Sequence, residues 1–90
     1  MLFRSFKSSD IYSKKIDNQV VILEKNKEHV RQLNEVASFL WENLKKPKSI
    51  DQLVSATVKE FDVDQKQAKK DVEEWVADYL DEGFLQEVKN

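Results

Sequence analysis

The stretch from Leu33 to Trp41 places the end of an extended segment directly against the start of a helix. Asn34 is suited to cap that helix, because its side chain can accept a backbone N–H that the first helical turn leaves unpaired. The residues that follow put apolar side chains on one helical face: Val36, Ala37, Leu40, Trp41 and Leu44. A strand-to-helix junction at this fixed point predicts an α+β domain.

Two extended segments, residues 11–16 and 19–23, precede this junction and are separated by the turn residues Asp17 and Asn18. Residues 19–23 form a continuous apolar run with three β-branched side chains, which favours a strand. A third and more polar segment follows over residues 28–33. Because the connections are short, we predict a three-stranded antiparallel β-meander.

Three helices are predicted after the meander. The first covers residues 35–44 and ends before Pro47, the only proline. The second begins with a capping box at Ser49 and Gln52. The third begins at Asp64, where Gln67 suggests a further capping box, and ends near Glu82. The fold class is therefore α+β, a three-stranded meander followed by three helices in a winged-helix-like arrangement.

The ends of the chain carry weaker signals. Residues 1–10 are mostly polar, with two phenylalanines among them. We predict that they form a flexible N-terminal segment before a single domain over residues 11–88. Gly83, the only glycine, is predicted to supply a left-handed helix end. The following residues 84–88 predict either a short strand or an apolar plug.

No catalytic apparatus is recognisable. The chain has no cysteine, one glycine and one histidine, so it lacks a thiol nucleophile, a glycine-rich phosphate loop and the ligands of a usual zinc site. His29 has no partner motif. We therefore expect a non-enzymatic protein without a metal or other cofactor. Because no signal peptide and no run of about 20 apolar residues is present, we also expect a cytoplasmic protein that does not enter a membrane.

Charge disfavours one alternative, a winged-helix DNA-binding protein. Residues 1–34 have a net charge of +3 and residues 35–90 of −5. The third predicted helix, residues 64–82, carries three lysines against seven acids. Phosphates would repel such a helix, so no nucleic-acid partner is expected.

An exposed sheet edge remains as the candidate site. The segment 28–33 is the least apolar of the three predicted strands, which suits an edge whose main-chain groups can pair with an extended peptide. The third helix, with Val72, Trp75, Val76 and Tyr79, is predicted to form a wall beside this edge. The same edge could instead pair with a second copy of the chain, so a monomer or a weak dimer is expected.

The order and spacing of these elements resemble the PqqD family. The resemblance covers residues 11–88 and is carried by Leu33-Asn34, Ala37, Leu40, Ile50-Asp51-Gln52-Leu53, Phe61-Asp62-Val63 and Leu80 to Leu85. Members of this family, also called RiPP recognition elements, bind the leader segment of a ribosomally made precursor peptide and present it to modifying enzymes.

The resemblance implies that a leader peptide docks as an added strand on the third strand, beside the third helix. On this chain it points to Glu28, His29, Val30, Arg31, Gln32, Leu33, Lys69, Val72, Glu73 and Val76. The length is similar to that of the separate recognition proteins of lasso-peptide pathways, whose partner is a distinct leader peptidase. Pyrroloquinoline quinone biosynthesis, with a radical enzyme as the partner, is the second possibility within the family.

Overall fold

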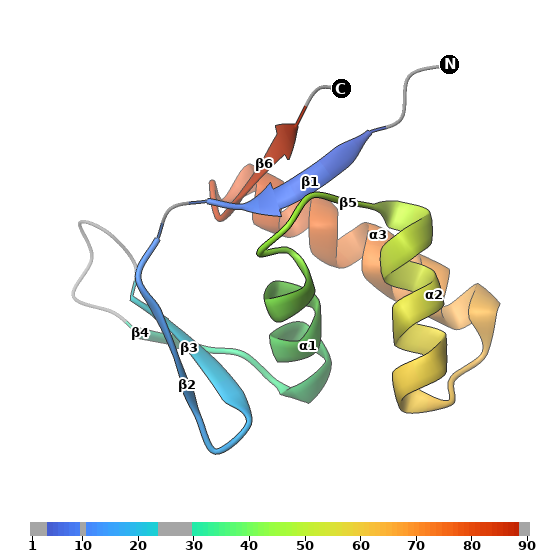
Figure 1. Ribbon diagram of the computed structural model, residues 1–90, viewed down its shortest axis with the longest axis horizontal. Coiled ribbons are helices and arrows are strands. Elements are labelled where there is room, and N and C mark those ends of the chain that lie inside the picture. Colours follow the sequence, from blue (N-terminus) through green and yellow to red (C-terminus); the bar gives the residue numbers. More distant parts are fainter. Residues whose placement is uncertain (1–3, 10, 24–29, 89–90) are drawn as a thin grey trace.

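The computed structural model describes residues 4–9, 11–23 and 30–88, which form two small antiparallel sheets and three helices (Figure 1). One sheet has the strand order β2-β3-β4 and the other β5-β1-β6. The elements, in chain order, are β1 (Ser5–Ser8), β2 (Ser13–Ile16), β3 (Gln19–Leu23), β4 (Val30–Gln32), α1 (Glu35–Asn43), β5 (Lys48–Ser49), α2 (Ile50–Phe61), α3 (Gln65–Asp81) and β6 (Leu85–Val88).

The sheet β2-β3-β4 confirms the predicted antiparallel meander. Ile16 pairs with Gln19 across a tight turn, and Leu23 pairs with Val30. The two turn residues Asp17 and Asn18 both have positive φ, of 49° and 70°. This conformation matches the right-handed twist of a hairpin, and Asn and Asp tolerate it better than other side chains. The apolar run of β3 buries Val20 and Ile22 against the helices.

The second sheet corrects the prediction of a flexible N-terminal segment over residues 1–10. Residues 5–8 form β1, the central strand between β5 and β6 (Figure 1). Phe6 is only 2% exposed, and Ser5 to Ser8 pair along the whole of β6. The sequence could not reveal this strand, because its partners lie more than 40 residues away and only one of its side chains is a large apolar group. Residues 1–3 and 10 lie outside the described residues.

The helix termini follow the predicted capping residues with one exception. The Asn34 side chain accepts the Ala37 N–H at 2.8 Å, and the Ser49–Gln52 capping box is complete. The Asp64 carboxylate accepts the N–H groups of Lys66 and Gln67. The Gln67 side chain, however, donates to Asp71 at 2.9 Å. The second predicted capping box is therefore only half formed.

Gly83 ends α3 as predicted, in a left-handed conformation with φ of 83°. The Phe84 N–H bonds to the Tyr79 carbonyl at 2.9 Å and the Gly83 N–H to the Leu80 carbonyl at 3.1 Å. These two bonds form a Schellman motif, which satisfies carbonyls that the end of a helix leaves unpaired. The chain then turns directly into β6, which settles the alternative between a strand and a plug.

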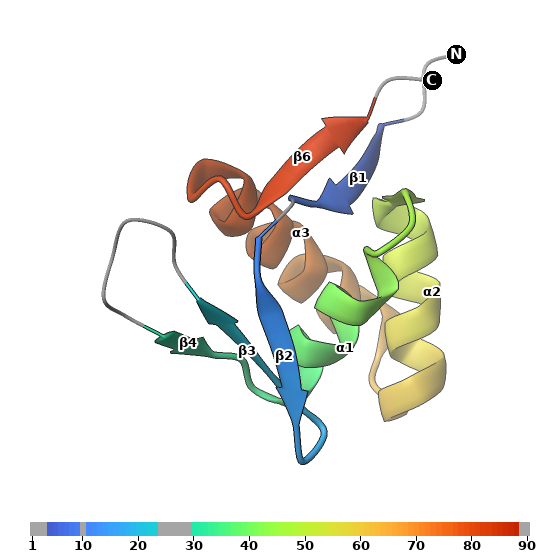
Figure 2. The same cartoon turned by 60° about the vertical axis from the view of Figure 1, so that its left-hand side comes forward.

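The hydrophobic core is built from side chains of the three helices and of both sheets. Figure 2 shows how these elements are arranged. Trp41 is 2% exposed, and its indole N–H donates to the Ser13 hydroxyl at 3.2 Å. Trp75, which was predicted in the wall beside the edge, is only partly buried and packs against this core. The largest fully buried side chains are Trp41, Phe6, Ile22, Leu40, Leu44, Leu53, Val20 and Val72.

Ser38 joins the meander to α1. Its hydroxyl is buried, accepts the Val20 N–H at 2.8 Å and donates to the Leu33 carbonyl at 3.2 Å. The Leu33 N–H bonds directly to the Val20 carbonyl at 2.8 Å. One hydroxyl group of α1 thus replaces one rung of the β3–β4 ladder. The end of β4 is thereby fixed to the first turn of the helix.

Ser38→Ala is expected to lower the free energy of unfolding by about 1–3 kcal/mol, because it leaves the buried Val20 N–H without an acceptor. Urea denaturation followed by circular dichroism measures the change. Ser55→Ala, on the exposed side of α2, is the matched control and should shift stability by no more than about 0.5 kcal/mol. Equal midpoints for the two variants would show that the hydroxyl does not hold the junction.

Candidate functional site

β4 is an edge strand, because it pairs with β3 on one side and with no other strand that the structure describes. Hydrogen bonds alternate along an antiparallel pair. Since Leu33 is bonded to Val20, the next bonded pair is Arg31 with Ile22. The N–H and C=O groups of Val30 and Gln32 therefore point to the opposite side. Within the described part of the chain they have no main-chain partner.

Arg31 reaches from β4 towards the end of α3. Its guanidinium carbon lies 4.9 Å from the centre of the Phe84 ring and 5.8 Å from that of Tyr79. One of its nitrogens lies 3.6 Å from a carboxylate oxygen of Glu82. These contacts place β4 next to the C-terminal half of α3, as two aromatic rings and one carboxylate hold the same side chain.

One stripe of α3 faces this edge. Asp71, Trp75, Asp78 and Glu82 follow each other at intervals of four, three and four residues, which places them on one side of the helix. Glu82 contacts Arg31, so this side is the one next to β4. We call these four residues the β4-facing stripe. It carries three carboxylates and no basic side chain.

The aromatic side chains at this place form a continuous stack. Trp75 and Tyr79 lie 4.2 Å apart with an angle of 26° between their rings, and Tyr79 meets Phe84 edge-on at 5.5 Å. Burial raises the pKa of the Tyr79 hydroxyl above its ordinary value, although Arg31 and the nearby indole N–H of Trp75 act to lower it. The phenol is therefore neutral at physiological pH. Among the described residues, Arg31 and Glu82 are the charged groups that act on this phenol.

An apolar row lies on the outer face of the same sheet. Leu23 pairs with Val30, and the Leu23 N–H bonds to the Tyr12 carbonyl at 3.0 Å. These three side chains lie side by side. Leu23 is 47% exposed, Val30 59% and Tyr12 66%. The edge of β4 thus has an aromatic and acidic surface on one side and an exposed apolar row on the other.

The structure separates the ten residues that the sequence pointed to. Glu28 and His29 lie outside the described residues. Val30, Arg31 and Gln32 form β4, as predicted, while Leu33 is buried and its N–H is already bonded.

The four residues predicted on α3 form a buried pair and an exposed pair. Val72 and Val76 are 0% and 3% exposed and belong to the core. Lys69 and Glu73 are exposed, but they lie beyond this buried stripe, on the side of α3 away from β4. The apolar spacing gave the buried face correctly. It could not tell which of the two polar flanks lies beside β4, because that depends on how the sheet packs.

Sequence reasoning placed Trp75 in the wall beside the edge but did not single out Asp78 and Glu82, which share its side of α3. The sequence signal that could have identified this side of α3 is the spacing of the β4-facing stripe, at intervals of four, three and four residues. Among the described residues, no group of three or more His, Asp or Glu side chains is arranged to hold a metal ion. No helix in the same part of the chain is long and apolar enough to cross a membrane.

The sequence model of one protein family, "Coenzyme PQQ synthesis protein D (PqqD)", matches residues 19–85. The chain belongs to the PqqD family. The match begins at β3 and runs through α3 to the first residue of β6, so it includes β4 and all three helices. The resemblance drawn from the sequence is thereby confirmed.

A solved structure, "TbiB1 in Complex with the TbiA(beta) Leader Peptide", is similar to this PqqD-family chain over 89% of its length and 94% of the other chain. The TM-score is 0.79 and the sequence identity is 27%. Among curated proteins, the comparison found no match.

Val72→Asp tests the assignment of Val72 to the core. Placing a carboxylate at a fully buried position is expected to cost on the order of 5 kcal/mol, close to the whole stability of so small a domain. Circular dichroism and urea denaturation should show a largely unfolded chain. Lys69→Asp introduces the same group at an exposed position of α3 and should stay folded. A well-folded Val72→Asp variant would contradict the buried position.

Proposed function

We propose that this PqqD-family chain is a non-catalytic binding module that captures the leader segment of a ribosomally synthesised precursor peptide. The leader adds as an extended strand to β4, beside α3. The observation that carries the proposal is the unpaired edge at Val30 and Gln32, which lies next to the β4-facing stripe. The similarity to TbiB1, whose structure contains a leader peptide, supports it.

Main-chain pairing would supply the general part of the affinity. The N–H and C=O groups of Val30 and Gln32 can form hydrogen bonds to one added strand, each contributing about 0.5–1.5 kcal/mol. β4 has only three residues, so these bonds alone give weak binding. Side-chain contacts must supply the remaining affinity and all of the specificity.

The two faces of the added strand would meet different surfaces. Alternate side chains of a strand point to opposite faces. Those facing α3 meet Trp75 and the three carboxylates of the β4-facing stripe. Those facing outward lie beside Val30 and extend the apolar row. We therefore propose a leader that carries lysine or arginine at positions facing α3 and apolar residues at the alternate positions.

Presentation to a separate enzyme completes the proposed role. The chain brings the leader to a modifying enzyme, either a leader peptidase of a lasso-peptide pathway or a radical enzyme of pyrroloquinoline quinone biosynthesis. The cytoplasm is the proposed compartment, since the precursor is made there. A chain of this size with a vacant edge at β4 is proposed to act as a monomer or a weak dimer.

A DNA-binding role is not favoured, although the helices have a winged-helix-like order. α3 would be the recognition helix, and it carries five acids against three lysines. The stripe that borders β4 is wholly acidic apart from Trp75. Phosphate groups would be repelled from this surface.

Gln32→Pro tests the strand addition. The Gln32 N–H points away from β3, so proline should leave the β3–β4 ladder intact and remove one hydrogen bond to the added strand. Binding of the leader of the precursor encoded beside this chain's gene is expected to weaken roughly tenfold by isothermal titration calorimetry. Gln32→Ala keeps the N–H and should bind as the parent chain does.

A matched pair of substitutions tests which flank of α3 meets the leader. Asp78→Lys reverses a charge on the β4-facing stripe, and Glu73→Lys makes the same change on the opposite flank. Because close charges matter more than distant screened ones, Asp78→Lys should weaken leader binding roughly fivefold or more, and Glu73→Lys by less than about twofold. The reverse order would place the leader on the Glu73 side.

Sedimentation of the free chain over a range of concentrations shows whether β4 pairs with a second copy.

A further inference from the structure

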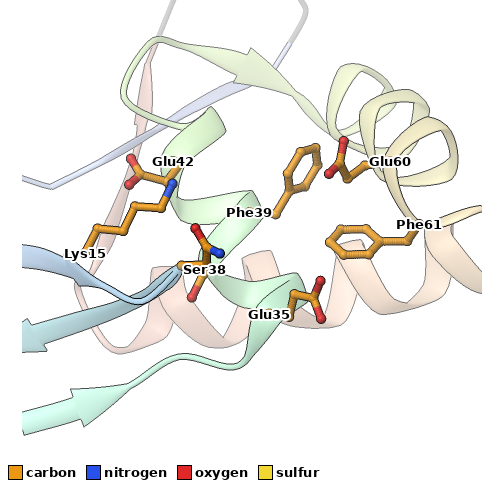
Figure 3. Close-up of a pocket in the computed structure, with 8 residues that line it drawn as sticks. Lys15, Glu35, Ser38, Phe39, Glu42, Glu60 and Phe61 are labelled. Atoms are coloured by element: carbon orange, nitrogen blue, oxygen red, sulfur yellow. The ribbon is translucent and has the colours of Figure 1, made fainter.

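A pocket of about 340 Å³ opens on the other side of the meander, between the β2–β3 turn, α1 and the end of α2 (Figure 3). It shares none of its residues with β4 or the β4-facing stripe. The sheet order β2-β3-β4 places the pocket at the β2 edge, opposite the edge proposed for the leader. Its lining residues are Lys15, Asn18, Glu35, Ser38, Phe39, Glu42, Glu60 and Phe61.

Two aromatic rings form the apolar part of this pocket. Phe39 of α1 and Phe61 of α2 lie 5.2 Å apart and meet edge to face at 88°. Both side chains are only half-buried, and Figure 3 shows them extending from α1 and α2 towards each other. An aromatic ring left partly open to solvent offers a flat apolar face, on which a planar group can stack.

Three carboxylates surround the rings, and only one of them lies close to basic side chains. Glu42 pairs with Lys45 at 3.4 Å, and Lys15 also extends towards it (Figure 3). Glu35 and Glu60 have no ion-pair partner among the described residues. Glu35 benefits from the N-terminus of α1. Glu60 lies in the last turn of α2, where the helix dipole disfavours a carboxylate.

We infer that this pocket binds a guanidinium group, the side chain of an arginine that a partner protein presents. Guanidinium is planar and always charged, stacks on aromatic rings and forms paired hydrogen bonds with carboxylates. These properties match Phe39 and Phe61 together with Glu35 and Glu60. The volume lies at the lower end of the range for small-molecule sites, which suits one inserted side chain.

The position of the pocket allows this contact to form together with leader binding. An arginine seated at the β2 edge leaves the β4 edge free, so partner and leader can be bound at the same time. That the partner is the modifying enzyme rests on the function proposed above. The chemical class of the ligand rests only on the pocket.

The test is an NMR titration of the full chain, labelled with ¹³C and ¹⁵N, with the peptide acetyl-Gly-Arg-Gly-amide. We expect saturable shifts at the rings of Phe39 and Phe61. The citrulline peptide acetyl-Gly-Cit-Gly-amide has nearly the same shape without the charge and should bind much more weakly. In the double variant Glu35→Gln/Glu60→Gln, affinity for the arginine peptide should fall roughly fivefold.

The double variant Glu73→Gln/Glu74→Gln removes the same charge from the surface of α3 and should bind the arginine peptide as the parent chain does. Equal losses in the two double variants, equal binding of the citrulline peptide, or no saturable shift at the two rings would overturn the inference. A parallel leader titration separates the two proposals. If Glu35→Gln/Glu60→Gln still binds the leader but not the arginine peptide, the loss is confined to the pocket and the site at β4 is intact. A parent chain that binds arginine and not leader would overturn the proposed function instead.

Discussion

The hydroxyl of Ser38 on α1 joins the helix to the sheet through two hydrogen bonds. It stands between the Val20 N–H and the Leu33 carbonyl, where a direct ladder bond would otherwise lie. Such a bond would join β3 to β4 without involving α1. With the hydroxyl inserted, β3, β4 and α1 share one buried set of hydrogen bonds, and the direction of β4 is fixed relative to the helices.

The fixed direction of β4 has consequences on both sides of the meander. On one side, Arg31 lies over Tyr79 and Phe84 and meets Glu82, which brings the edge of the sheet to α3. On the other side, the β2–β3 turn is held against α1 and the pocket with Phe39 and Phe61 forms beside it. A small domain can thus present two separate surfaces, because the sheet between them is only three strands wide.

Both surfaces are acidic, and some of their carboxylates lower the stability of the free chain. Neighbouring carboxylates repel each other along the β4-facing stripe, and Glu60 stands at the unfavourable end of α2. Features that a fold retains against its own stability often belong to binding sites, where a ligand offsets the cost. For a chain with so thin a core, cationic partners would also add to the stability of the folded state.

The sequence determined the local structure. Asn34, Ser49, Asp64 and Gly83 set the ends of the helices. The apolar spacing also gave most of the buried face of the helices, although Val36 of α1, predicted on that face, is 37% exposed. These signals act between residues close in the chain, so they can be read without the fold. The order of elements was also sufficient to identify the family.

Tertiary structure alone decided the rest. β1 exists because β5 and β6, distant in the chain, lie on either side of it. The flank of α3 that borders the edge of β4, and the removal of Val72 and Val76 into the core, follow from how the sheet packs on the helix. A helical pattern fixes which side chains are buried and leaves its two polar flanks equivalent. Only long-range contacts such as the one between Arg31 and Glu82 distinguish them.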